Sequence, residues 1–175
     1  RLPSPLGYER AVSVSAGFAH SLALTTDGAL WSWGGGFLGR LGHGDQQVQW
    51  LPKKVEAFTG QRAVAVSAGL THSIALTADG AVWSWGYGVC GQLGHGNQQN
   101  QLLPKKIEAL AGRRVVAVSA GGKHGFALTA DGAVWSWGYG GVRRRGVGGH
   151  RVELRGRRVV ARPGRRVRAG AAGEH

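Results

Sequence analysis

The stretch HSIALTADGAVWSWG, residues 72–86, decides the fold of this chain. It contains two runs rich in apolar, β-branched and aromatic residues, which is the composition of β-strands. Between the runs stands Ala78-Asp79-Gly80, and Asp-Gly is a strong signal for a type I′ hairpin turn with positive φ at both central residues. We therefore predict two antiparallel strands, over residues 72–77 and 81–85, joined by a tight turn.

The same stretch recurs along the chain with a fixed step of 52 residues. The motif Trp-Ser-Trp-Gly stands at residues 31–34, 83–86 and 135–138. Residues 11–62 match residues 63–114 at 35 of 52 positions without a gap, and residues 115–138 match 63–86 at 19 of 24. A fixed period of this length indicates a repeat architecture.

The period divides the chain into units. Repeat 1 covers residues 11–62, repeat 2 covers 63–114, and repeat 3 covers 115–166, degenerate and arginine-rich from residue 142. Residues 1–10 are the end of a preceding repeat or a linker. Residues 167–175 are the start of a fourth repeat or a disordered tail. The degenerate part has two interpretations, a diverged repeat or a tail that is disordered or misread.

Each repeat is expected to contain four short strands. In repeat 2 these are residues 64–68, 72–77 and 81–85, followed by a glycine-rich loop and a last strand over residues 105–109 that Pro104 introduces. Four short antiparallel strands joined in this way make one blade of a β-propeller. The fold class is therefore all-β, with about three 52-residue repeats forming a partial propeller. A solenoid is the alternative, but 52 residues with long loops is long for one coil.

Composition narrows the class of protein further. No apolar run approaches the roughly 18–20 residues that a membrane span needs. Cys90 is the only cysteine, which excludes an internal disulfide framework and favours an intracellular compartment, cytoplasmic or nuclear. Of the net charge of +13, residues 142–175 contribute eleven arginines against two glutamates. The basic character belongs mainly to this tail.

The repeat resembles that of the regulator-of-chromosome-condensation family. The resemblance lies in Ala-Gly-x-x-His-Ser-x-Ala-Leu-Thr-x-Asp-Gly-x-x-Trp-Ser-Trp-Gly, then Gly-x-Leu-Gly-His-Gly and Leu-Pro-x-x-Val/Ile, over residues 11–141. Known members fold as seven-bladed propellers, so this chain looks like a fragment of a ring or an incomplete ring. The end blades of an incomplete ring expose apolar faces, and we expect such a chain to self-associate.

Most of the repeated polar residues are expected to build the blade. One histidine per repeat (His20, His72 and His124) is typical of a structural residue satisfied by backbone groups within its own blade, rather than of a base or a metal ligand. His43 and His95 lack a second ligand at metal spacing and are predicted to pack loops. The aspartates that precede glycine are turn residues. We therefore predict no catalytic residue, no metal and no cofactor.

The paired tryptophans have three interpretations: core packing, stacking on nucleic-acid bases, and light absorption. The family includes a plant ultraviolet-B receptor that senses light through a Gly-Trp-Arg-His-Thr motif. The corresponding segments here, residues 17–20, 69–72 and 121–124, contain no tryptophan. Trp83 and Trp85 stand two residues apart in a strand and so project from one face. We expect them to pack in the core.

What remains for binding lies in the loops and the tail. Loops that vary on a fixed scaffold commonly carry specificity. Candidate partner-binding residues are Phe37, Trp50, Tyr87, Asn100 and Tyr139. For Trp50, burial beneath its own loop is the alternative. Candidate phosphate-contact residues in the tail are Arg143, Arg144, Arg145, Arg157, Arg158, Arg165 and Arg166.

The resemblance implies a non-catalytic scaffold for protein–protein interaction, a fragment of a larger regulator. A larger parent protein could carry exchange or ubiquitin-ligase activity. The first alternative is guanine-nucleotide exchange on a Ran-type small GTPase, although no insertion breaks the 52-residue period to serve as a wedge. The second is association with chromatin or nucleic acid through residues 142–175.

Overall fold

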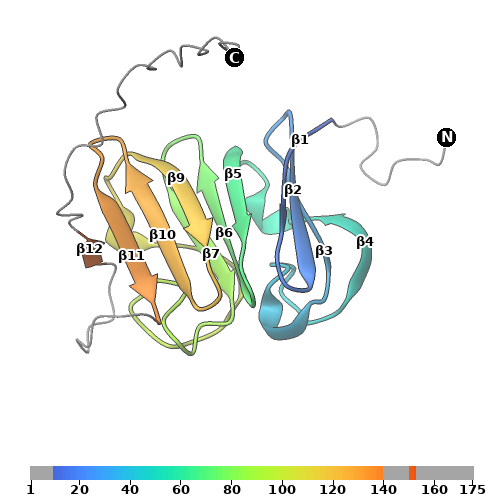
Figure 1. Cartoon of the computed structure of the whole chain (residues 1–175). Coiled ribbons are helices and arrows are strands. Elements are labelled where there is room, and N and C mark those ends of the chain that lie inside the picture. Colours follow the sequence, from blue (N-terminus) through green and yellow to red (C-terminus); the bar gives the residue numbers. More distant parts are fainter. Residues whose placement is uncertain (1–9, 140–149, 153–175) are drawn as a thin grey trace, which may run out of the picture.

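The computed structural model describes residues 10–139 and 150–152 of the 175-residue chain. These residues form three four-stranded antiparallel sheets that stand side by side in chain order (Figure 1). No helix of the described part is long and apolar enough to cross a membrane. The all-β fold of propeller blades is confirmed, and we call the three sheets blades 1, 2 and 3.

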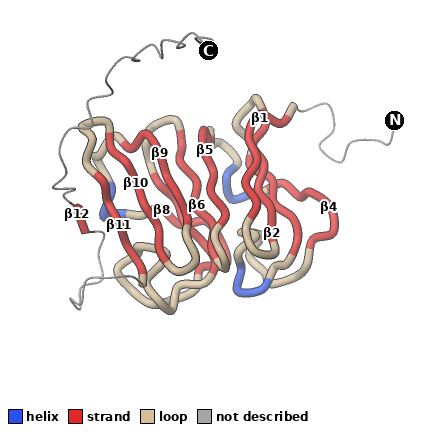
Figure 2. The backbone as a smooth tube through the Cα atoms, viewed as in Figure 1, coloured by secondary structure: helices blue, strands red, loops and turns tan. Residues whose placement is uncertain are grey.

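The strands of each blade are joined in sequence order, so every blade is a meander. Blade 1 contains β1 (Ala11–Ala16), β2 (His20–Thr25), β3 (Leu30–Gly34) and β4 (Gln49–Lys54). Blade 2 contains β5 (Ala63–Ala68), β6 (His72–Thr77), β7 (Val82–Gly86) and β8 (Gln101–Lys106). Blade 3 contains β9 (Val115–Ala120), β10 (His124–Thr129), β11 (Val134–Gly138) and β12 (His150–Val152). Short 3-10 helices stand in the connections (Figure 2): η1 (Phe37–Gly39), η2 (Glu56–Phe58) and η3 (Glu108–Leu110).

The last strand of the repeat lies earlier than the sequence pattern predicted. β8 begins at Gln101, opposite Gly86, and residues 108–110 form η3 instead of a strand. The backbone turns there because Ile107 and Leu110 are both buried in the core between blades 2 and 3. Pro104 lies inside β8 and has no N–H to donate to the sheet. The strand tolerates this because β8 is the outer strand of its blade and pairs with β7 in an irregular register.

The hairpin turn also differs from the expected type. Gly80 has a φ of +84°, whereas Asp79 does not have a positive φ. The Asp79 carboxylate instead accepts hydrogen bonds from Thr77 Oγ1 at 2.6 Å and from the Ala81 N–H at 3.2 Å. This bonding closes the loop from within, so only its glycine has to adopt the left-handed conformation.

The core lies between successive blades. Leu22, Leu24 and Leu30 of blade 1 pack against Ala75 and Trp85 of blade 2, and Phe58 closes this cluster from the connection after β4. An equivalent cluster joins blades 2 and 3 around Ile74, Leu76 and Trp137. The first strands of the blades are also linked, because Ser15 Oγ accepts the Ala68 N–H at 3.0 Å and Ser67 Oγ accepts the Ala120 N–H at 2.9 Å.

The outer faces of blades 1 and 3 expose side chains that are covered at the inner interfaces. Val14 is exposed, whereas its counterpart Val66 is half-buried. At the other end Leu128 is 38% exposed, whereas Leu76 at the same repeat position is 3% exposed. The same sequence element is therefore core or surface according to whether a neighbouring blade covers it.

In blade 3, β12 places Arg151 opposite Trp135. In blade 2 the residue opposite the equivalent Trp83 is Lys106, and the 52-residue step from Lys106 leads to Arg158. The last strand of blade 3 therefore lies earlier in the sequence than the 52-residue period predicts.

Candidate functional site

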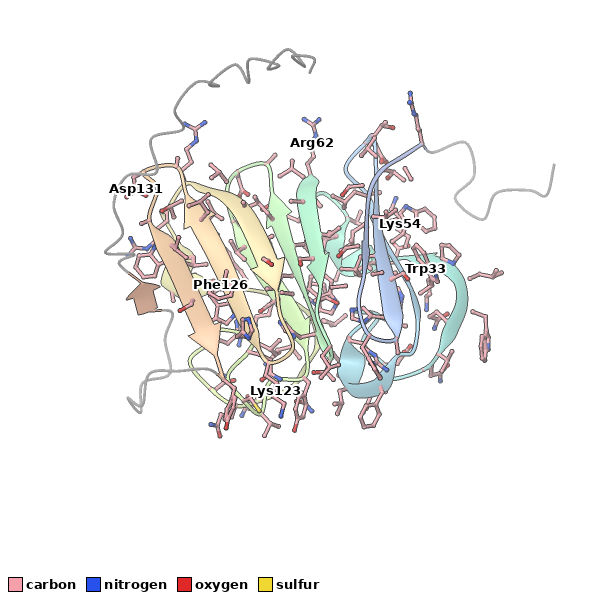
Figure 3. All side chains as sticks on the ribbon, in the orientation of Figure 1. Trp33, Lys54, Arg62, Lys123, Phe126 and Asp131 are labelled. Atoms are coloured by element: carbon pink, nitrogen blue, oxygen red, sulfur yellow. The ribbon has the colours of Figure 1, made fainter. Side chains whose placement is uncertain are left out.

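The connections between strands gather at two opposite ends of the blades. The hairpin face carries the turns after β2, β6 and β10 and the connections after β4 and β8. The loop face carries the connections after β1, β5 and β9 and the long loops after β3 and β7. Figure 3 shows Arg62 and Asp131 at the hairpin face and Lys123 at the loop face.

The repeated histidines join blades. His20 is buried, and its Nε2 lies 2.9 Å from Ser73 Oγ in the next blade. Because the Ser73 hydroxyl donates its proton to the Arg40 carbonyl at 2.8 Å, His20 Nε2 is the donor of the first bond. The structural role agrees with the sequence, but the partner is a hydroxyl across the interface and not a backbone group of the same blade.

His72 occupies the same position one blade further on but lacks this bond. It is wholly buried, and neither ring nitrogen has a hydrogen-bond partner among the described residues. The residue 52 positions after Ser73 is Gly125, and a Cβ there would lie 2.5 Å from the Trp137 ring. Burial lowers the pKa of His20 and of His72 to about 4, so both rings are neutral near pH 7.

The histidines of the long loops hold those loops to the third strand of the same blade. His43 Nε2 lies 2.9 Å from Ser32 Oγ, and His95 Nε2 lies 3.1 Å from Ser84 Oγ. Burial lowers the pKa of both rings. Within residues 10–139 and 150–152 no three histidine, cysteine, aspartate or glutamate side chains are grouped to hold a metal ion.

Trp85 and Trp137 pack between successive blades. Trp85 is fully buried, lies 5.9 Å from the Phe58 ring centroid and donates its indole N–H to the Arg40 carbonyl at 2.9 Å. Trp137 repeats this bond with the Gln92 carbonyl at 2.8 Å. Each indole thus anchors the long loop of the preceding blade.

The turn aspartates also act within the fold. The hydrogen bond from the neighbouring threonine hydroxyl lowers the pKa of the Asp27 and Asp79 carboxyl groups below its usual range. Beside each of these two turns lies a shallow hollow, lined by Lys54 and Arg62 in blade 1 and by Lys106 and Arg113 in blade 2. Because the hollow recurs with the repeat, it follows from the way a blade is built.

The candidate partner-binding residues occupy two places. Phe37 is 62% exposed and Tyr139 is 70% exposed on the loop face, and Tyr87 is half-buried there. The Asn100 amide oxygen accepts the Gly88 N–H at 2.9 Å, so this side chain also closes its own loop. Trp50 is apart from them, on the outer strand β4.

Trp50 is 87% exposed and therefore not buried beneath its own loop. Its counterpart Leu102 lies against the long loop of the preceding blade, since a Cβ on Gly39 would come within 2.6 Å of Leu102 Cδ2. In the described structure no blade precedes blade 1. The exposure of Trp50 thus follows from its position in the first described blade.

Sequence reasoning missed two exposed residues of the loop face. Phe18 is 77% exposed, and Leu70 at the same position of blade 2 is also exposed. A signal was present, because the residue at this position changes from phenylalanine to leucine to glycine through the three repeats. Phe18, Leu70, Phe37 and Tyr139 give the loop face its apolar character. The seven candidate phosphate-contact arginines lie outside the described residues.

Comparison with known proteins identifies the repeat. The pattern of the regulator of chromosome condensation (RCC1) repeat matches residues 27–76 and 79–128, and a second pattern of the same name matches residues 11–40, 63–92 and 115–142. The chain belongs to the RCC1 repeat family. The resemblance inferred from the motifs is thereby confirmed.

The relatives are longer than this chain. It is 43% identical over 164 residues to the human E3 ubiquitin-protein ligase HERC2, covering 93% of the chain and 3% of HERC2. It is 43% identical over 126 residues to the mitochondrial RCC1 domain-containing protein RUG3 of Arabidopsis thaliana, covering 72% of the chain and 28% of RUG3. The chain therefore spans less than a third of each of these relatives.

Solved structures share the fold. Human WBSCR16 superposes with a TM-score of 0.77 at 26% identity, covering 83% of this chain and 38% of WBSCR16. Prp20p of Saccharomyces cerevisiae superposes with a TM-score of 0.65 at 30% identity, covering 74% of this chain and 32% of Prp20p. Three blades of this chain thus correspond to part of a larger propeller.

Proposed function

We propose that this chain is a non-catalytic propeller scaffold for protein–protein interaction and part of a larger regulator. The observation that carries the proposal is the set of exposed aromatic side chains on the loop face, Phe18, Phe37 and Tyr139. These residues stand in connections that differ between repeats on a constant scaffold. Apolar surface of this kind is characteristic of binding faces.

The relatives favour a protein partner. Yeast Prp20p has been described with binding properties to Gsp1p and histones, and yeast RCC1 (Prp20) has been crystallised with Kap60 bound. HERC2 is a ligase in which the matched repeats form a small part. We propose an intracellular location, cytoplasmic or nuclear, although RUG3 is a mitochondrial protein.

The test uses the full-length protein with Phe18, Phe37 and Tyr139 all changed to serine. Wild-type and variant are immobilised, and captured proteins are quantified by mass spectrometry. We expect at least one partner to fall tenfold or more. The control is Leu103→Ser, an exposed apolar position on the outer strand β8 that should leave capture unchanged. If the triple serine variant captures as much of every partner as Leu103→Ser does, the loop face is not the binding surface.

The second candidate is guanine-nucleotide exchange on a Ran-type small GTPase. The observation in its favour is the 30% identity to Prp20p over 74% of this chain. The test is the release of a fluorescent guanine nucleotide from such a GTPase, with and without the full-length protein. Accelerated release would establish this role, and unchanged release would remove it.

A third candidate is chromatin or nucleic-acid association through residues 142–175, favoured by their eleven arginines. Deletion of these residues should abolish the salt-sensitive part of DNA binding, measured by fluorescence anisotropy at low and high salt. DNA binding that persists unchanged after the deletion would show that residues 142–175 are not the DNA-binding segment.

We also propose that the chain self-associates through the outer faces of blades 1 and 3. Val14 and Leu128 on these faces are more exposed than their counterparts at the inner interfaces. Sedimentation velocity over a range of concentrations tests this, and a monodisperse monomer at all concentrations would contradict it.

A further inference from the structure

Arg40 is a buried charged residue at the junction of blades 1 and 2. Only 8% of its surface is exposed. Its carbonyl accepts hydrogen bonds from Trp85 Nε1 at 2.9 Å and from Ser73 Oγ at 2.8 Å, so blade 2 fixes its backbone. Its side chain donates from Nε to the Gly35 carbonyl at 2.7 Å and from Nη1 to the Leu70 carbonyl at 3.4 Å. Both blades therefore hold the guanidinium at the loop face.

In the part of the chain that the structure describes, no acidic group matches the charge of this guanidinium. Among the described residues no carboxylate forms an ion pair or hydrogen bond with Arg40, and burial alone shifts its pKa, downward. Of the six described acidic residues, only Asp45 lies in a connection of the loop face, and its carboxylate accepts the Gln47 N–H. Buried charges in proteins are ordinarily paired, because removing a charge from water is costly.

One part of the guanidinium remains available. Nη2 has no hydrogen-bond partner in the described part of the chain, yet it is not among the atoms closed off from solvent. A guanidinium presents its donors in a planar fork that matches a carboxylate. The free end of this fork is thus open to a group that arrives from outside.

The fold does not require an arginine at this position. In blade 2 the equivalent residue is Gln92, whose carbonyl accepts Trp137 Nε1 just as the Arg40 carbonyl accepts the indole of blade 2. The residue equivalent to Gly35 is Tyr87. A Cβ on Gly35 would lie 2.6 Å from Arg40 Nη2, so the glycine leaves the room that the guanidinium occupies. Blade 1 thus combines a glycine and an arginine where blade 2 has neither.

The backbone next to the guanidinium carries apolar residues. The Phe18 N–H donates to the Gly69 carbonyl at 3.3 Å. Phe18 therefore lies beside the segment of blade 2 in which the Leu70 carbonyl accepts the hydrogen bond from Arg40. Phe18 and Leu70 are both exposed. The site therefore consists of one recessed cation with apolar neighbours, instead of the strip of exposed lysines and arginines that neutralises a phosphate backbone.

We propose that Arg40, flanked by Phe18 and Leu70, binds the carboxylate of an aspartate or glutamate in an acidic segment of a protein partner. The site lies on the same face as the proposed scaffold function and rests on it. It adds the chemistry that the partner must present, a carboxylate next to an apolar residue.

The probe is an acetylated Glu-Phe-Glu-Glu-Leu-Glu peptide, titrated into the full 175-residue chain labelled with ¹⁵N at arginine. We expect the Arg40 Nε–H resonance to shift on titration. We expect binding to weaken at least fivefold in Arg40→Gln and to weaken similarly when every glutamate of the peptide is replaced by glutamine. Arg40→Gln introduces the residue that blade 2 carries at this position, and a thermal melt verifies that it folds.

Arg62→Gln is the matched control, because Arg62 is an exposed arginine of the hairpin face. It should bind the peptide like the wild type. Equal affinity of wild type and Arg40→Gln, or no shift of the Arg40 Nε–H, overturns the proposal. A six-nucleotide thymidine strand that shifts this resonance when the peptide does not would show a phosphate ligand and overturn it as well.

The two proposals can fail separately. If partner capture is lost in the Phe18, Phe37 and Tyr139 serine variant but Arg40→Gln changes neither capture nor peptide binding, the scaffold stands and the carboxylate site is wrong. If neither variant changes capture, the loop face is not the interaction surface.

Discussion

Two tryptophans at the same repeat position are expected to contribute very differently to stability. Trp85 and Trp33 both occupy the third position of Trp-Ser-Trp-Gly. Trp85 is fully buried against blade 1, whereas Trp33 is half-buried on the outer face of blade 1 (Figure 3). The perturbation is the same truncation to alanine in each case, so the neighbouring blade is the principal difference.

The expected magnitudes follow from this difference. Truncating a fully buried tryptophan to alanine costs about 3–5 kcal/mol, because buried area is lost and a closed cavity is left. The Arg40 carbonyl loses the indole donor but keeps the Ser73 hydroxyl, which limits the additional cost. Trp33→Ala removes a side chain that already contacts water and leaves an open surface, so we expect about 1–2 kcal/mol. The difference between the two variants is then about 1–4 kcal/mol.

The assay is urea unfolding followed by far-ultraviolet circular dichroism, at low protein concentration so that association does not cover the face that carries Trp33. If Trp85→Ala does not fold, Trp85→Phe keeps a six-membered aromatic ring but removes the indole N–H and part of the buried ring, and should cost about 1–3 kcal/mol. Equal destabilisation by Trp33→Ala and Trp85→Ala would refute the reasoning, because it would show that the outer face of blade 1 is as well covered as the interface.

Three further changes test the joints between blades. Lowering the pH from about 6.5 toward 4 should reduce stability. His20 and His72 have a pKa of about 4 when folded and take up protons on unfolding, so each histidine can cost up to about 3 kcal/mol of stability over this range. A constant urea midpoint over this range would contradict the prediction. Ser73→Ala should cost about 1–3 kcal/mol by removing the hydroxyl that bridges the blades, whereas Ser21→Ala, at the same position of blade 1, should change the free energy of unfolding by less than about 0.5 kcal/mol. Gly86→Ala should reduce the free energy of unfolding by at least about 1 kcal/mol, because Gly86 has a φ of +104° that alanine adopts only with strain. Calorimetry should show this as a lower melting temperature.

The repeat pattern was sufficient to predict the blade. Strand composition and the Asp-Gly turn placed the hairpin of residues 72–86 within one residue, because these are local preferences of the backbone. The last strand was misplaced. Ile107 and Leu110 end it for a reason that lies in the next blade, where they are buried. Local propensity contains no information about that contact.

The sequence alone determined that this protein is built from 52-residue blades and that its repeated histidines, aspartates and tryptophans belong to them. Only the tertiary structure decided that His20 bonds Ser73 across an interface, that Phe18 is exposed, and that Arg40 is buried with no counter-charge among the described residues. The physical reason is that burial and pairing depend on the neighbouring blade. Identical motifs such as those of Trp33 and Trp85 therefore lie in different environments, which the sequence of one repeat cannot specify.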